Sequence, residues 1–164
     1  MAQLAFWRVC LALGVAYLIQ TTYLAQLLVY ETRCDLLLVV VVCVALLGGQ
    51  ERGAWCGFLA GVLSGYAGAW HLGSFIVSRV AAGAAVGYLP RKVSIENAFA
   101  PIICAVLGTL VADLVFLVMS PTNFSLTWWL RHTIVSCLLH AIVAYPLYFL
   151  LKKFLCPTAK FHCN

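Results

Sequence analysis

The chain has 164 residues, of which 65% are hydrophobic and only 9% are charged, and its mean hydropathy is +1.03. A water-soluble domain needs roughly a quarter of its residues charged to cover its surface, so this composition excludes an ordinary soluble domain. The net charge is +5, but the basic residues stand singly or in pairs at the edges of apolar runs, without the basic face and interleaved aromatics that nucleic-acid binding requires.

Apolar segments separated by short polar connections follow one another along the whole chain. A helix needs roughly 20 apolar residues to cross about 30 Å of hydrocarbon. By that measure we predict six membrane-spanning helices, at about Leu4–Leu28, Leu36–Leu47, Gly53–Trp70, Leu72–Leu89, Ala98–Met119 and Trp128–Leu151. The second segment is short, which makes it a candidate for a thinned or partly re-entrant element.

These segments predict the fold class and the domain organisation. We expect an all-α integral membrane protein whose residues 1–155 form one compact bundle of about six transmembrane helices. Residues 156–164 are then a short cytoplasmic tail. Each connection is short, so no soluble domain is inserted between the helices.

Lysine and arginine gather on one side of this arrangement. That side holds Arg8, Arg52, Arg91, Lys92, Lys152, Lys153 and Lys160, and the other side holds Arg33 and Arg131. Because cytoplasmic loops carry an excess of Lys and Arg, this distribution predicts that both termini lie in the cytoplasm. Trp128 and Trp129 then lie at the outer interface, where amphipathic rings are enriched.

The third segment carries glycines at every fourth position, namely Gly53, Gly57, Gly61 and Gly65. Membrane helices associate through close backbone approach and dispersion contacts, which small residues permit. The stripe therefore predicts either packing against another helix of the same bundle or docking of a partner's helix. The spacing by itself does not separate these alternatives.

Two opposite charges lie inside apolar segments, Arg79 in the fourth and Asp113 in the fifth. A charge in hydrocarbon costs several kcal/mol unless it is paired or reaches water. At about 1.5 Å per residue, both lie roughly 10 Å from the outer ends of their helices, so we predict an intramembrane ion pair. The alternatives are that Arg79 extends outward to the interface and that Asp113 accepts a hydrogen bond from a hydroxyl.

The remaining polar residues give no sign of catalysis. His140, near the middle of the sixth segment, is interpreted as a neutral side chain bonded to a neighbouring helix, with a proton relay as the alternative. The eight cysteines lie mostly in apolar runs and lack zinc-site spacing. With no nucleophile beside a base, no paired carboxylates and no phosphate-binding loop, we expect no enzyme activity, no metal and no organic cofactor.

The third and fourth segments also resemble a known family. Gly57-Phe-Leu-Ala-Gly61, Leu72-Gly73 and Gly87-Tyr88-Leu89 are similar to the central signature of the rod shape-determining protein MreD. Asp35-Leu-Leu-Leu matches that family's acidic start to the second span. The resemblance covers the whole chain in length and number of spans, but only residues 35–89 in motif.

One position departs from the family pattern, because Gly65 stands where members often carry Asp. If that Asp takes part in partner binding in the family, this chain binds its partner in another way. Otherwise the resemblance implies a non-enzymatic scaffold of the bacterial elongation, or rod-shape, complex in the cytoplasmic (inner) membrane. It implies binding to MreC, a single-span protein with a periplasmic domain, alongside MreB, RodA and its penicillin-binding protein in peptidoglycan synthesis.

A second resemblance implies a different function. The chain is also similar to the substrate-binding subunits of energy-coupling-factor vitamin transporters, which dock a coupling subunit through small residues of the first helix. Ala12 and Ala16 fit that spacing loosely. Such a subunit needs a polar, aromatic-lined pocket, to which five residues are candidates to contribute: His71, Arg79, Asp113, Trp128 and Trp129.

Overall fold

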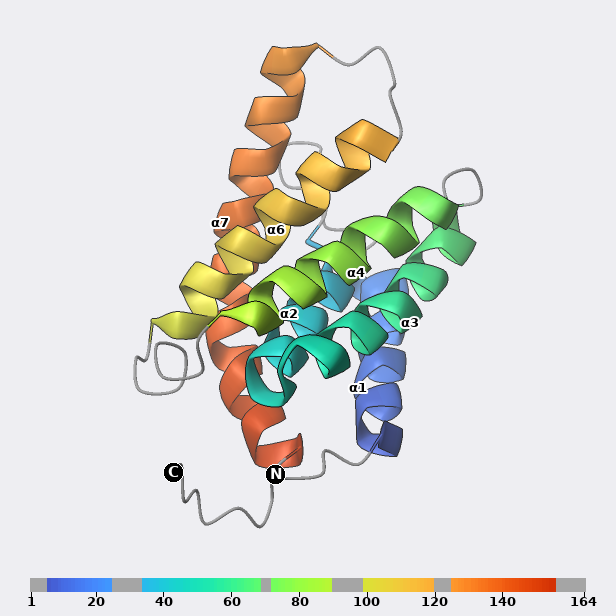
Figure 1. The fold of residues 1–164 in the computed structure, drawn as a ribbon, viewed down its shortest axis with the longest axis vertical. Coiled ribbons are helices and arrows are strands. Elements are labelled where there is room, and N and C mark those ends of the chain that lie inside the picture. Colours follow the sequence, from blue (N-terminus) through green and yellow to red (C-terminus); the bar gives the residue numbers. More distant parts are fainter. Residues whose placement is uncertain (1–5, 25–33, 69–71, 90–98, 120–124, 156–164) are drawn as a thin grey trace.

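The computed structural model describes residues 6–24, 34–68, 72–89, 99–119 and 125–155. Within these ranges the chain forms six α-helices and one π-helical turn, and no strand (Figure 1). The elements are α1 (Phe6–Ile19), η1 (Gln20–Leu24), α2 (Leu36–Gly48), α3 (Gln50–Gly68), α4 (Leu72–Tyr88), α6 (Ala100–Met119) and α7 (Leu126–Leu155). The prediction of an all-helical fold with six helices is confirmed. The expected tail, residues 156–164, lies outside the described part.

The predicted helix boundaries differ from the structure at the start of α3 and at both ends of α7. We expected a connection from Gly48 to Arg52, but α3 already begins at Gln50, so only Gly49 separates it from α2. Gly49 makes this possible with a φ of 86°, a left-handed conformation that costs residues with a Cβ free energy. Its N–H donates to the carbonyl of Ala45 at 2.8 Å, which caps the end of α2. The last helix, α7, extends beyond both predicted ends.

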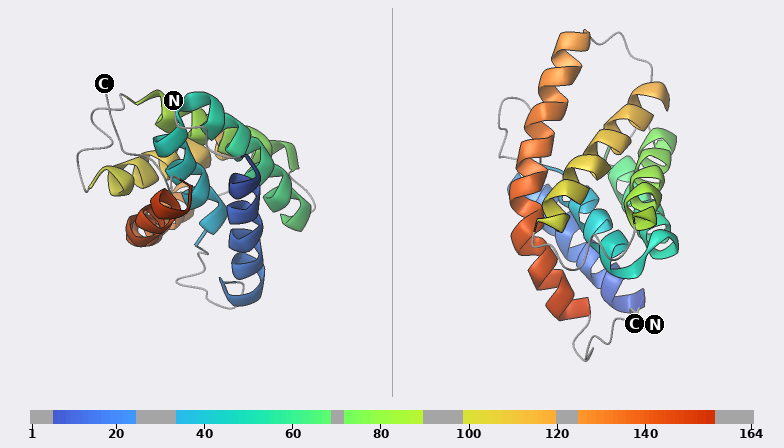
Figure 2. Two further views of the ribbon diagram at one scale, coloured as in Figure 1. Left: turned by 90° about the horizontal axis from the view of Figure 1, so that it is seen from below. Right: turned by 60° about the vertical axis from the view of Figure 1, so that its left-hand side comes forward.

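The short second segment is the central helix of the bundle. Every residue from Leu37 to Leu46 is at most 6% exposed, and α1, α3, α4, α6 and α7 all contact α2. A helix that is apolar on all sides has no face to give to water and is buried all round. Its 13 residues span about 20 Å, and the surrounding helices enclose that length (Figures 1 and 2). It is a regular α-helix from Leu36 to Gly48.

The glycine stripe of α3 faces α4. A Cβ on Gly53 would lie 2.5 Å from the carbonyl oxygen of Gly83, and a Cβ on Gly61 would lie 2.5 Å from the Cα of Ile76. A Cβ on Gly57 would collide with the carbonyl of Arg79, and one on Gly65 would lie 2.9 Å from the Cα of Leu72. The stripe therefore packs within the chain, and the backbones of α3 and α4 run side by side (Figure 1).

The outer faces of α6 and α7 carry mostly large apolar side chains. Large apolar side chains are exposed at intervals of three or four residues, at Ile103, Leu107, Leu110, Leu114 and Val118 on α6 and at Leu130, Ile134, Leu138 and Ile142 on α7. The buried face of α7 carries polar groups instead, including Thr133, Ser136 and His140. Among the described residues, two helices are long and apolar enough to cross a membrane, Ala100–Met119 and Thr127–Leu155.

The start of α1 and the end of α7 lie at the same end of the molecule (Figure 1, bottom). A guanidinium nitrogen of Arg8, Nη1, donates a hydrogen bond of 3.3 Å to the carbonyl of Phe154. The first and the last described helices therefore lie close together at these two ends.

The glycine contacts predict the result of a minimal substitution. Gly61→Ala places its methyl 2.5 Å from the Ile76 backbone, so α3 and α4 must separate, and we expect a loss of about 1–3 kcal/mol in the free energy of unfolding. The matched control is Gly73→Ala in α4, where a Cβ would meet nothing within 4 Å. Unfolding of the purified proteins in mixed detergent micelles measures both. Equal stability of the two variants would contradict the close approach.

Candidate functional site

The start of α2 lies deep inside the bundle rather than at its end. The backbone N–H of Asp35, the N-cap residue, donates to His140 at 2.9 Å. His140 is 14 residues from the start of α7 at Leu126 (140 − 126), which places this contact about 21 Å along that helix. The unpaired N–H groups of a helix start are therefore held where side chains must satisfy them.

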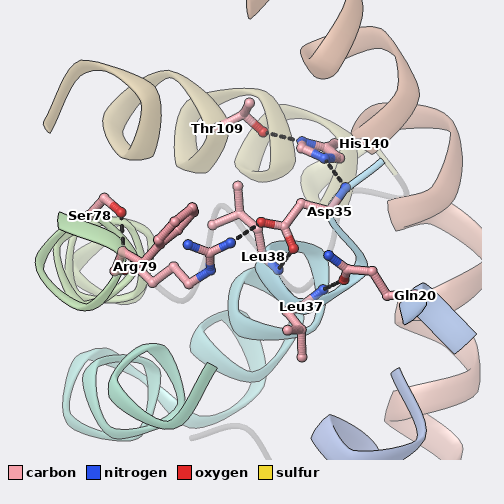
Figure 3. Close-up of polar contacts among 9 residues, drawn as sticks. Gln20, Asp35, Leu37, Leu38, Ser78, Arg79, Thr109 and His140 are labelled. Atoms are coloured by element: carbon pink, nitrogen blue, oxygen red, sulfur yellow. Dashed lines mark hydrogen bonds and ion pairs between the residues drawn. The ribbon is translucent and has the colours of Figure 1, made fainter. Parts of the chain in front are cut away.

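Side chains from two parts of the chain satisfy these groups (Figure 3). The Asp35 carboxylate accepts from the Leu38 N–H at 3.2 Å, and the Gln20 side-chain oxygen accepts from the Leu37 N–H at 3.2 Å. Asp35 is thus a conventional helix N-cap, whereas Gln20 reaches across from η1. Together with His140, these side chains fix the positions of η1, α2 and α7 relative to one another.

The second carboxylate oxygen of Asp35 forms an ion pair with Arg79 of α4 (Figure 3). The Arg79 side chain is only 6% exposed, and its guanidinium also lies 4.9 Å from the centroid of the Phe75 ring, a cation–π contact. Pairing and ring contact both compensate a buried charge, which would otherwise be strongly destabilising. Asp35 therefore joins α2 to α4 as well as capping α2.

The hydrogen bonds around His140 assign its tautomer. Its Nε2 accepts from the Asp35 N–H, so the ring proton lies on Nδ1, which is 2.8 Å from the hydroxyl oxygen of Thr109. That hydroxyl donates its own proton to the Ala105 carbonyl at 2.8 Å and is free to accept from Nδ1. The pattern fits a neutral imidazole with both nitrogens occupied, in agreement with the expectation of a His bonded to a neighbouring helix.

A cavity of about 520 Å³ opens beside this network. Every helix contributes to its lining, which includes Tyr17, Gln20, Asp35, Ser64, Phe75, Ser78, Arg79, Asp113, Phe116, Trp128, Trp129, His132, Ser136 and His140. Three of these residues carry buried polar atoms without a hydrogen-bond partner in the described part of the chain: Ser64 Oγ, Arg79 Nε and Asp113 Oδ2. Buried polar groups are normally paired, so the cavity wall holds unused hydrogen-bonding capacity.

The predicted ion pair between Arg79 and Asp113 is wrong in its partner. Arg79 pairs with Asp35, and Asp113 Oδ2 has no partner among the described residues. The prediction rested on the distances of Arg79 and Asp113 from the outer ends of their helices. It placed Asp35 in the loop before α2, outside the apolar part of the bundle. Because α2 begins well inside the bundle, its cap residue reaches Arg79 first. Arg79 also does not extend to the interface, which removes that alternative.

The structure distributes the other candidate residues over different places. Trp128 and Trp129 line the cavity together with Arg79 and Asp113, whereas His71 lies outside the described residues. Ala12 and Ala16 belong to a separate groove between α1 and α7. No group of three or more His, Cys, Asp or Glu within the described ranges is placed to hold a metal ion.

Sequence reasoning missed the structural roles of Asp35, Gln20 and Ser64. For Asp35 a signal existed, because an Asp directly before an apolar run is a typical helix N-cap. A cap at the start of a helix too short to cross a bilayer also indicates a buried helix end. For Gln20 and Ser64, nothing in the local pattern distinguishes a cavity-facing polar residue from one that packs between helices.

Comparisons with models of protein families, with curated proteins and with solved structures found no match to this chain.

The ion pair predicts strong coupling between its two members. Arg79→Met leaves the Asp35 charge buried, and Asp35→Asn leaves Arg79 charged while keeping a capping side chain. Each single variant is expected to lose about 3–5 kcal/mol in the free energy of unfolding. The double variant strands no charge and should recover part of the summed loss, as a double-mutant cycle in detergent micelles measures.

A second cycle, with Asp113→Asn in place of Asp35→Asn, is the matched control. Since Asp113 makes no ion pair with Arg79 but lines the same cavity, the coupling energy of this second cycle should be smaller than that of the first. Coupling in the second cycle and additivity in the first would contradict the geometry and restore the pair predicted from depth.

Proposed function

We propose that this protein is a multi-pass protein of the bacterial cytoplasmic membrane that acts there as a non-enzymatic scaffold of the cell-elongation machinery, with MreC as its main partner. The observation that carries the membrane location is the apolar outer surface of the bundle. Large apolar side chains are exposed along α6 and α7, whereas Thr133, Ser136 and His140 are buried next to a mostly apolar core. A helix of a water-soluble protein carries charged and polar residues on its outer face, and an apolar outer face is typical of a membrane span.

The distribution of basic residues supports cytoplasmic termini. Among the described residues, Arg8 lies at the start of α1, and Lys152 and Lys153 lie in the last turn of α7. These two helix ends are adjacent in space. An excess of Lys and Arg marks the cytoplasmic side, so this end of the bundle faces inward and the cavity, near the start of α7, opens toward the outside.

A groove between α1 and α7 supports binding of a single-span partner. It has a volume of about 560 Å³. Its lining is almost wholly apolar and comprises Leu11, Ala12, Val15, Ala16, Ile19, Leu36, Val40, Leu147, Leu150, Leu151, Lys153 and Phe154. Ala12 and Ala16 are small enough to let another helix approach closely. Since α4 already covers the glycine stripe of α3, this groove is the better candidate for the helix of MreC.

The polar network supports a scaffold rather than an enzyme. Thr109 is the hydroxyl nearest to an imidazole, but its proton is directed to the Ala105 carbonyl. A catalytic base must instead accept the proton of its nucleophile. His140 holds the start of α2 in place through the Asp35 N–H. RodA, its penicillin-binding protein and MreB are the further partners that the family resemblance implies.

One observation favours a second candidate function. A cavity of about 520 Å³ with polar and aromatic walls has the size of a small-molecule site, which is roughly 300–1,000 Å³. This fits a substrate-binding subunit of an energy-coupling-factor vitamin transporter, in which the α1 groove would receive the coupling subunit.

The proposed topology predicts the sidedness of two exposed positions. In a background with all cysteines replaced by alanine, Gln50→Cys at the α2–α3 corner and Ser125→Cys before α7 introduce single thiols at exposed sites. A membrane-impermeant maleimide should label Ser125→Cys in intact spheroplasts and should label Gln50→Cys only after the cells are broken. Labelling of both from the same side would contradict the six-span bundle.

The proposed docking groove predicts a selective loss of partner binding. Ala12→Phe fills the groove with a ring, so the helix of MreC is displaced, and we expect its co-purification to fall by about tenfold, equivalent to about 1.4 kcal/mol. The matched control is Leu110→Phe on the exposed face of α6, which should leave co-purification unchanged. Full retention of MreC by Ala12→Phe, with loss in the control, would move the interface to α6.

A further inference from the structure

We propose that the cavity between the six helices binds a small organic cation, whose N–H group is received by Asp113 and whose body lies against the aromatic walls. The inference rests on the membrane bundle of the proposed function and not on MreC binding. The cavity and the α1–α7 groove share no lining residue, so the two sites can be tested separately.

The charges of the cavity wall favour a positive ligand. Among the residues that line it, Asp35 and Arg79 neutralise each other in an ion pair, and His140 is held neutral by its two hydrogen bonds. Asp113 and His132 remain in the lining, and of these two residues Asp113 has the buried polar atom, Oδ2, without a hydrogen-bond partner among the described residues. An unpaired carboxylate in an apolar bundle costs several kcal/mol, which a bound cation with an N–H donor would remove.

The aromatic side chains of the same cavity point independently to a flat or cationic ligand. Phe75 and Phe116 contact each other at a centroid distance of 5.0 Å, and Trp128 stacks on His132 at 5.3 Å. Trp129 and Tyr17 complete the aromatic part of the lining. The faces of Trp, Tyr and Phe rings attract organic cations, as Phe75 already does with the Arg79 guanidinium.

Two further atoms of the cavity wall without hydrogen-bond partners indicate which other polar group the ligand has. Arg79 Nε is a donor on a side chain that is 6% exposed, and Ser64 Oγ is a hydroxyl that both donates and accepts. Both residues line the cavity. A ligand with an acceptor group besides its cationic nitrogen would satisfy these atoms as well. The chemical class is therefore a protonated amine with an aromatic or other flat apolar part and at least one hydrogen-bond acceptor.

The test uses three ligands that share one ring and differ in charge: tryptamine, a cation at pH 7, indole-3-ethanol, which is neutral, and indole-3-acetate, an anion. Binding to the full-length protein in lipid nanodiscs is measured by calorimetry and by thermal unfolding. We expect tryptamine to bind at least about tenfold more tightly than the neutral and anionic compounds. Equal binding of the three, binding of none, or preference for the anion would overturn the inference.

Substitutions at Asp113 then assign the selectivity to this carboxylate. Asp113→Asn keeps the shape of the side chain and should lower the affinity for tryptamine by about tenfold or more without changing that for indole-3-ethanol. Asp113→Glu retains the charge and should retain the preference for the cation. The control, Leu114→Ala, lies on the exposed face of α6 and should bind like the unaltered protein. Cation selectivity that survives in Asp113→Asn would overturn the assignment.

Failure of tryptamine binding and failure of the scaffold function give different results. If MreC still co-purifies while no cation selectivity is found, the cavity inference is wrong and the scaffold proposal stands. If cation selectivity is found in a protein that does not bind MreC, the cavity inference stands and the second candidate function gains support. The unaltered protein answers both questions even where an Asp113 variant fails to fold.

Discussion

Asp35 caps the N-terminal end of a helix that begins inside the bundle, and the arrangement of the other helices follows from that. Backbone N–H groups in an apolar surrounding must find partners, and here Asp35, Gln20 and His140 supply them. The charge that makes Asp35 a good cap then needs a partner of its own. Arg79 provides it from α4, so one helix cap fixes the relation of four elements.

The close approach at the glycine stripe is what allows the ion pair to form. Gly57 faces the backbone carbonyl of Arg79, so the absence of a side chain on α3 lets α4 lie close enough to α2 for Arg79 to reach Asp35. A bulkier residue at Gly57 would move the guanidinium as well as the backbone. Stability and the geometry of the cavity wall are therefore coupled, because one side chain, Arg79, serves both.

The bundle offers two kinds of surface, which differ in chemistry and in place. The groove of α1 and α7 is apolar, contains Ala12 and Ala16, and suits another helix. The cavity is polar and aromatic, contains the unpartnered atoms of Ser64, Arg79 and Asp113, and suits a small molecule. A scaffold that carries both can bind a protein through one surface and a small molecule through the other, with the buried network around α2 lying between them.

The sequence by itself determined the helical class and the six helices, and it showed that Arg79 must either be paired or reach the interface, because apolar length and the cost of a charge in an apolar segment are local properties. It did not determine which acid pairs with Arg79. That choice depends on where α2 begins relative to α4, and α2 starts well inside the bundle, at the level of His140. The distance of a residue from the end of its own helix does not tell how far one helix is displaced along its axis relative to another, because helix packing sets that displacement. Only the tertiary structure therefore placed Asp35 on Arg79 and left Asp113 facing the cavity.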